Sequence, residues 1–193
     1  MESIIVKHHQ YEVVEILSSD SYKCLLKNRY FFVKIFDLEK SENKSKFLSY
    51  LKIHQSNISL PKLYAFDKKR GAVVLQFLDG QLVSDYILDH DFNENLYRQI
   101  FRNSYMARIV KLNLDYSLDK WMLCGDSIFY IGFSSEPYVQ ENDFTKNIIR
   151  EWFLSKELSQ YYKNKGILFD KSRILDDFKV NKEMVLMTCK YYQ

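Results

Sequence analysis

The sequence predicts an α+β fold in which a β-rich part, residues 1–80, precedes a mostly helical part, residues 81–193. Two observations carry this prediction. Before the break Leu78-Asp79-Gly80 the apolar residues fall in short β-branched and aromatic runs, and after it they recur about every three and a half residues. The hydrophobic content of 47% is enough for one domain, or two small lobes, with a real core.

The first part is predicted to hold five antiparallel strands and one helix. Five runs have the length and composition of strands: 11–17, 22–27, 30–36, 63–67 and 72–77. Between the third and the fourth run, residues 37–54 place apolar side chains at helical spacing behind a charged start. The predicted order is therefore three strands, one helix and two strands, with a hairpin turn over 68–71.

The second part is predicted to be helical around one small hairpin. The expected elements are a short helix 82–88, a long helix with an apolar stripe over 96–112, a hairpin 121–133, a polar loop 136–142 and one or two closing helices over 175–191. Apolar residues between Phe144 and Leu158 predict a further amphipathic helix, with Asp143 as its candidate cap and its end near Gly166.

Composition argues for an intracellular chain. The longest apolar runs are strand-sized, so no membrane partner is expected, and the start MESIIVKHH lacks the features of a secretory signal. The cysteines Cys24, Cys124 and Cys189 are odd in number and far apart, which suits a reducing compartment and no metal cage. The predicted localisation is cytoplasmic.

The charge pattern does not favour nucleic acid as a partner. The net charge is +3, and both signs are interspersed along the chain. Lys62, Lys68, Lys69 and Arg70 lie close together, but the last three fall in the predicted hairpin turn, where solvated charges are common.

The order of elements from about Tyr11 to Phe133 resembles the protein-kinase-like superfamily. The run YFFVKIF looks like the third-strand motif V-A-I-K, which implies that Lys34 grips the ATP phosphates. In that family a glutamate on the following helix holds the lysine, and Glu42 is the candidate here. The resemblance implies one continuous kinase-like domain, with an N-lobe 1–80 and a reduced C-lobe 81–193.

A second pair of motifs looks like the catalytic loop H-R-D-x-x-x-x-N and the metal motif D-F-G. In NLDYSLDKWML, Asp115 matches the catalytic base, Asn113 replaces the histidine and Lys120 replaces the asparagine. In SIFYIGF, Gly132 replaces the aspartate of D-F-G. Both side chains that hold Mg²⁺ in the family are therefore missing, and the first loop, Ser18-Ser19-Asp20-Ser21, has no glycine to close on phosphate.

These departures predict a pseudokinase, a binding or scaffolding module with a protein partner, rather than an enzyme. Phosphoryl transfer depends on electrostatic stabilisation, and losing one stabilising group costs on the order of 10²–10³ in rate. Lys34, Glu42 and Lys120 are the candidate nucleotide-binding residues, and Asp115 would be catalytic only in an active chain. ATP is the candidate ligand, Mg²⁺ is not expected and no metal site is assigned.

Two other functions stay open at this point. An active compact atypical kinase would transfer the γ-phosphate of ATP to a protein or small molecule, with Asp119 or Asp126 as a metal ligand. In the pseudokinase, Lys120 could itself stand in for the metal beside bound phosphate. A nucleic-acid-associated adaptor would instead use the basic surface over residues 62–70.

Overall fold

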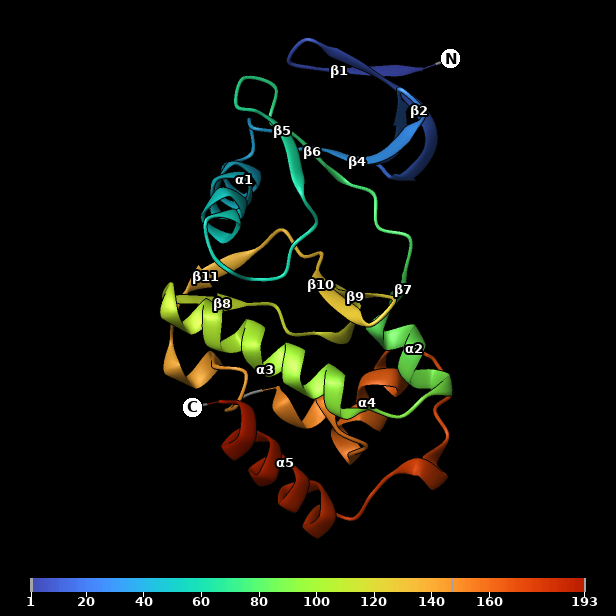
Figure 1. Ribbon diagram of the computed structural model, residues 1–193, viewed down its shortest axis with the longest axis vertical. Helices are drawn as coiled ribbons and strands as arrows, with labels where there is room; N and C mark the ends of the chain where they lie inside the picture. Colours follow the sequence, from blue (N-terminus) through green and yellow to red (C-terminus); the bar gives the residue numbers. More distant parts are fainter. Residues whose placement is uncertain (1, 147, 193) are drawn as a thin grey trace. The chain divides into compact units, whose positions relative to one another are not determined.

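The computed structural model describes residues 2–146 and 148–192 and has a mixed α+β fold (Figure 1). The chain divides into two compact units. The N-terminal unit comprises Met1–Gln55 and Leu60–Asp79, and the C-terminal unit comprises Ser56–Ser59 and Gly80–Gln193. No helix in the described ranges combines the length and apolar character needed to span a bilayer.

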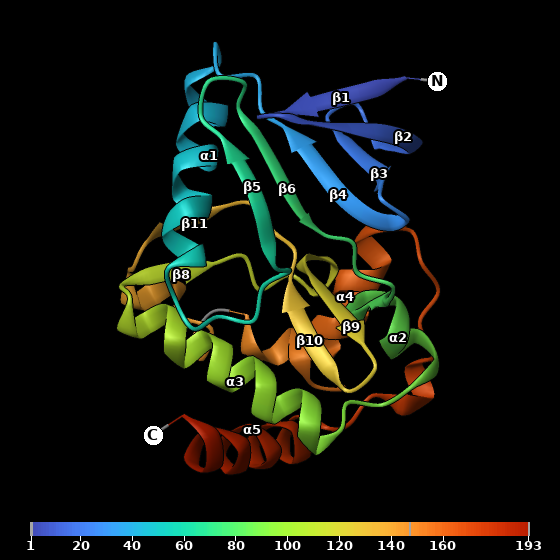
Figure 2. The ribbon, with the colours of Figure 1, turned by 45° about the horizontal axis from the view of Figure 1, so that its top comes forward.

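The N-terminal unit is a curled antiparallel sheet with one helix (Figure 2). The strand order is β1-β2-β3-β4-β6-β5. Its elements are β1 (Ser3–Val6), β2 (His9–Ser18), β3 (Ser21–Leu26), β4 (Arg29–Ile35), α1 (Ser41–His54), β5 (Leu63–Asp67) and β6 (Ala72–Gln76). Gly71 completes the predicted turn between β5 and β6 with a φ of 64°, a value that glycine adopts readily.

The prediction of five strands was wrong, because this sheet has six. The additional strand is β1, which pairs with β2 from Ser3 opposite Glu12 to Val6 opposite His9. The turn between them places Lys7 at a φ of 54°. Since the turn contains none of the glycine or asparagine that marks a tight hairpin, a four-residue strand before it carries little signal in the sequence.

Alternation along β4 separates the two faces of the sheet. Phe31 and Val33 point into the core inside the curl, whereas Lys34 and Phe36 lie on the other face, because successive side chains of a strand alternate. α1 packs through Phe47, whose ring centroid is 5.3 Å from that of Phe36 and 4.3 Å from that of Phe66. In both ribbon views α1 runs beside β5 (Figures 1 and 2).

The C-terminal unit surrounds its small sheets with helices. Its strands and α-helices are β7 (Gln81–Leu82), α2 (Val83–Asp89), α3 (Glu94–Ile109), β8 (Leu112–Leu114), β9 (Trp121–Cys124), β10 (Ser127–Tyr130), β11 (Ser135–Pro137), α4 (Lys156–Asn164) and α5 (Asp177–Tyr191). The described residues of this unit also form the 3₁₀ turns η1 (Leu118–Lys120), η2 (Gln140–Asn142), η3 (Ile149–Trp152) and η4 (Lys171–Arg173). β9 pairs with both β7 and β10, and β11 pairs with β8.

The prediction of one amphipathic helix from Asp143 to about Gly166 was wrong in its first half. That stretch forms η3 and then a separate helix, α4, which begins where the Ser155 hydroxyl accepts the Leu158 N–H at 3.1 Å. Asp143 caps no long helix. Its carboxylate accepts hydrogen bonds from Thr145, at 2.7 Å to the hydroxyl, and from the hydroxyl of Tyr192 at 2.6 Å.

An aromatic cluster supports the segment that resembles the catalytic loop. Five buried rings lie within ring-contact distance of one another, and Trp152 donates its indole N–H to the Tyr116 carbonyl at 2.8 Å. The members are Tyr116, Trp121, Tyr130, Phe144 and Trp152. Trp152 is fully buried and belongs to the core of the C-terminal unit.

Candidate functional site

Lys34 on β4 is paired with a carboxylate of its own unit. Its ammonium lies 2.8 Å from Asp20 Oδ2 and 3.3 Å from the hydroxyl of Ser21, and its side chain is only 16% exposed. The pairing follows from strand register, because Ser21 lies directly opposite Lys34 in the β3–β4 ladder. The residue before Ser21 is therefore held beside the lysine.

Asp20 is fixed in this position by several hydrogen bonds. Oδ1 accepts the hydroxyls of Ser18 and Ser21, both at 2.9 Å, and the Asp20 carbonyl accepts the Ile35 N–H at 2.9 Å. Burial alone would raise the pKa of Asp20, but the hydrogen bonds from Lys34, Ser18 and Ser21 outweigh it and hold the pKa below its ordinary value. The carboxylate is therefore ionised beside the ammonium at neutral pH.

Glu42, the expected partner of Lys34, makes its ion pair elsewhere. Its carboxylate bonds the Lys46 ammonium at 2.5 Å, one turn further along α1, and its side chain is 77% exposed. Such an exposed i, i+4 pair contributes little to stability, because water screens it. The acidic partner of Lys34 thus comes from the first loop and not from the helix.

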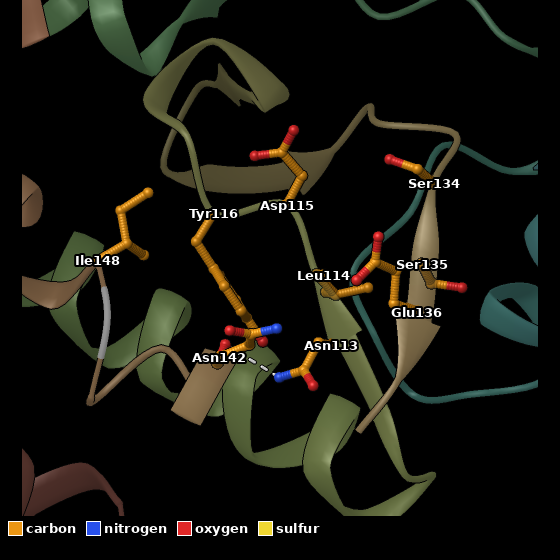
Figure 3. Close-up of a pocket in the computed structure, with 9 residues that line it drawn as sticks. All are labelled: Asn113, Leu114, Asp115, Tyr116, Ser134, Ser135, Glu136, Asn142 and Ile148. Atoms are coloured by element: carbon orange, nitrogen blue, oxygen red, sulfur yellow. Dashed lines mark hydrogen bonds between the residues drawn. The ribbon is translucent and has the colours of Figure 1, made fainter. Parts of the chain in front are cut away.

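Asp115 follows β8 and lines a pocket of about 330 Å³ in the C-terminal unit (Figure 3). Its Oδ1 accepts the Ser117 N–H at 3.0 Å, and its own N–H points to the Tyr130 hydroxyl at 3.4 Å. Figure 3 shows the Asp115 carboxylate and the Tyr116 ring pointing in opposite directions. The pocket also contains Glu136, so two carboxylates and no basic side chain line it among the described residues.

Lys120, one of the predicted nucleotide-binding residues, lies in a small ion-pair network. Asp119 Oδ2 accepts Lys165 at 2.7 Å and lies 3.5 Å from the Lys120 ammonium. Burial alone would raise the pKa of Asp119, but the hydrogen bond from Lys165 and the charge of Lys120 hold the pKa below its ordinary value. Asp119 is therefore shared between two lysines, and the group of three keeps a net positive charge.

Gly132 has no room for a side chain. A Cβ on Gly132 would lie 2.3 Å from the Tyr130 hydroxyl oxygen and 2.4 Å from the adjacent ring carbon, far inside van der Waals contact. Tyr130 is fully buried and donates its hydroxyl to the Ser134 carbonyl at 2.7 Å. The aspartate that the D-F-G motif carries could not be placed at Gly132 unless Tyr130 moved.

Asn113 and Asp126 have local structural roles. Asn113 is buried and bonds the backbone of the following loop, donating to the Asn142 carbonyl at 3.0 Å (Figure 3) and accepting the Val139 N–H. Asp126 is exposed at the hairpin tip, where its carbonyl accepts the side-chain amide of Gln99 at 2.6 Å. Within the part of the chain that the structure describes, no three His, Cys, Asp or Glu side chains form a metal-binding group.

The basic residues of the alternative nucleic-acid surface border a capped turn. Asp67 Oδ1 accepts the N–H groups of Lys69 and Arg70 at 3.0 and 3.2 Å. Lys62 lies over the Tyr64 ring at 5.3 Å. The confirmed hairpin turn accounts for the clustering of these charges.

Sequence reasoning missed two residues that shape these sites. Tyr130 fills the space beside Gly132, and the strand pattern alone could not show this. Glu151 is half-buried, and burial followed by the nearby charges of Asp115 and Asp119 raises the pKa of its carboxyl.

The structure groups the predicted site residues by unit. Lys34 and Glu42 belong to the N-terminal unit, whereas Asp115 and Lys120 belong to the C-terminal unit. No protein-family model matches this sequence, and no curated protein matches it. The assignment of function therefore depends on the local geometry.

Proposed function

We propose that this chain is a pseudokinase, a kinase-like binding or scaffolding module that does not transfer phosphate. The observation that carries the proposal is the contact between Gly132 and Tyr130. In the kinase-like alignment Gly132 stands where an aspartate holds Mg²⁺, and here the Tyr130 ring fills the space that such a side chain needs.

The Lys34–Asp20 pair supports the same proposal. A lysine that binds nucleotide phosphates must offer its positive charge to the ligand, but here Asp20 lies 2.8 Å from it. ATP would have to compete with an anion that is covalently part of the chain. We therefore expect ATP to bind weakly or not at all, and without help from Mg²⁺.

A phosphotransfer assay tests the proposal. The chain is incubated with γ-³²P-labelled ATP, Mg²⁺ or Mn²⁺, and generic protein substrates, with Asp115→Ala as the matched control. We expect the same background label in both proteins. Transfer by the wild type that disappears in Asp115→Ala would establish the active compact kinase instead.

A further inference from the structure

The segment after α4 is folded back onto the helix. α4 ends in a Schellman motif, in which the Ile167 N–H donates to the Tyr162 carbonyl and the Gly166 N–H to the Lys163 carbonyl, both at 3.0 Å. Gly166 supplies the left-handed conformation, with a φ of 71°. The Phe169 ring then stacks on Tyr162 with centroids 5.0 Å apart. The start of the segment is therefore fixed against α4.

The far end of the segment is anchored as well. The Arg173 guanidinium donates to the Leu88 carbonyl at 2.6 Å and bonds the Asp91 carboxylate at 2.7 Å. The Leu175 N–H donates to the Leu154 carbonyl at 2.8 Å. Both ends of the segment between α4 and α5 (Figure 1) are bonded to the rest of the unit, so its backbone is held in place. Residues 167–174 of this segment are called the wall below.

A groove of about 490 Å³ lies between α4 and this wall, within the range of volumes of ligand-binding clefts. α4 contributes side chains three, four and seven residues apart, which share one helix face. The opposite face of α4 is buried through Leu158 and Tyr162. The lining residues are Lys156, Ser159, Gln160 and Lys163 from α4, and Ile167, Leu168, Phe169, Lys171 and Ile174 from the wall, with Gly166 at the turn.

The groove is cationic. Three lysines line it, and none of its described lining residues is acidic. Lys156 is paired with Asp177 at 2.8 Å. Lys163 and Lys171 are exposed, and across residues 2–146 and 148–192 neither lies within ion-pair distance of a carboxylate. The groove therefore attracts an anionic partner, since unpaired charge lining a concavity steers opposite charge toward it.

The same groove offers an apolar contact. Leu168 is 97% exposed and Ile167 is 37% exposed, although the Schellman motif and Phe169 fix the backbone around them. A partner can bury this solvent-exposed leucine without first ordering a flexible loop, because the backbone around it is already fixed. This lowers the entropic cost of binding.

We propose that this groove docks an acidic segment of a partner protein that carries an apolar anchor residue. Carboxylates of the segment would bond Lys163 and Lys171, and its anchor would cover Leu168. A groove of about 490 Å³ can receive an inserted side chain, which the flat surface of a bilayer does not offer. The proposal depends on the groove alone and stands whether or not the chain is a pseudokinase.

A selection from a random peptide library displayed on phage tests this proposal without assuming a partner. The full chain is immobilised, and the enriched peptides are sequenced. We expect enriched peptides to combine two or more acidic residues with a Leu, Ile or Phe. The best peptide is then synthesised with a fluorophore, and its dissociation constant is measured by anisotropy at low and high salt.

Matched variants locate the binding site. We expect Lys163→Glu with Lys171→Glu, and separately Leu168→Asp, to weaken the labelled peptide at least tenfold. Lys44→Glu with Lys52→Glu on α1, and Leu186→Asp on α5, change exposed residues of the same types outside the groove and should alter affinity less than twofold. Thermal melts of all the variants check that the fold is retained.

Three results would overturn the proposal. One is a selection that enriches no acidic peptide, or one whose peptides bind the groove variants as well as the wild type. Another is binding to phosphatidylserine-containing vesicles that Leu168→Asp abolishes, which would assign the groove to a membrane. The last is a dimer in sedimentation velocity that Leu168→Asp dissociates, which would assign it to a second copy of the chain.

Discussion

Replacing Gly132 with alanine tests whether Tyr130 closes this position to a side chain. The backbone of Gly132 does not lie in the left-handed region, so any loss of stability comes from the clash of the new side chain and not from backbone strain. The added Cβ would lie 2.3–2.7 Å from three atoms of Tyr130. Overpacking of this kind costs roughly 1–3 kcal/mol, and displacing Tyr130 from its bond to Ser134 adds about 1 kcal/mol. We therefore expect a loss of about 3 kcal/mol.

Urea denaturation of the wild type and Gly132→Ala measures this loss as a lower midpoint at an unchanged slope. The control is the same substitution in a Tyr130→Ala background. There the ring is absent, and we expect Gly132→Ala to cost less than about 1 kcal/mol because the two changes are coupled through one contact. A loss below about 1 kcal/mol in the wild-type background would refute the reasoning.

Three further predictions concern the carboxylates of Asp20, Glu151 and Asp143. Asp20→Asn should lower the free energy of unfolding by about 1 kcal/mol at pH 7, since its ion pair with Lys34 is half-exposed. Because the pKa of Asp20 is lowered on folding, this difference should vanish as the pH falls through that pKa, as urea titrations between pH 7 and pH 2 would record. Glu151→Gln should raise the melting temperature at pH 7 and change it little at pH 4. Burial and nearby carboxylates raise the pKa of Glu151, so ionising this side chain lowers the stability of the fold as the pH rises. An equal effect at both pH values would contradict this cause. Asp143→Ala should cost about 3 kcal/mol, because it removes charged hydrogen-bond acceptors from Thr145 and the hydroxyl of Tyr192; limited proteolysis that cuts the C-terminal helix no faster than in the wild type would argue against this role.

The strands of the first unit could be predicted because their side chains alternate. β3 to β6 begin and end within a residue or two of the predicted runs. β1 could not be found in this way, because its pairing with β2 depends on the left-handed Lys7 and on packing of Val6 in the core. Short strands are stabilised by what they pack against rather than by their own composition.

The region from Asp143 to Gly166 shows where periodicity misleads. Its apolar residues are spaced as in one helix, but the backbone at Phe153 is extended, with φ −130° and ψ 160°, and this ends the 3₁₀ turn after Trp152. Ser155 then starts a new helix. Tertiary packing determines the backbone conformation of this region, and the spacing of apolar residues alone does not show where one helix ends and the next begins.

The candidate site was predicted in part. The sequence located Lys34 on a strand, but the predicted helix over 96–112 left β8, the strand before Asp115, unrecognised. It could not show that Asp20 is the ion-pair partner of Lys34, because that contact follows from the β3–β4 register. The role of Tyr130 beside Gly132 depends on a side-chain packing arrangement that has no sequence signature.

The magnesium dependence of ATP binding tests the central claim most directly. Isothermal titration of the chain with ATP would be carried out once in excess Mg²⁺ and once in EDTA. We predict no binding, or weak binding with the same dissociation constant in both solutions. Binding that Mg²⁺ tightens tenfold or more would show that the chain holds the metal–nucleotide complex, and would contradict the account.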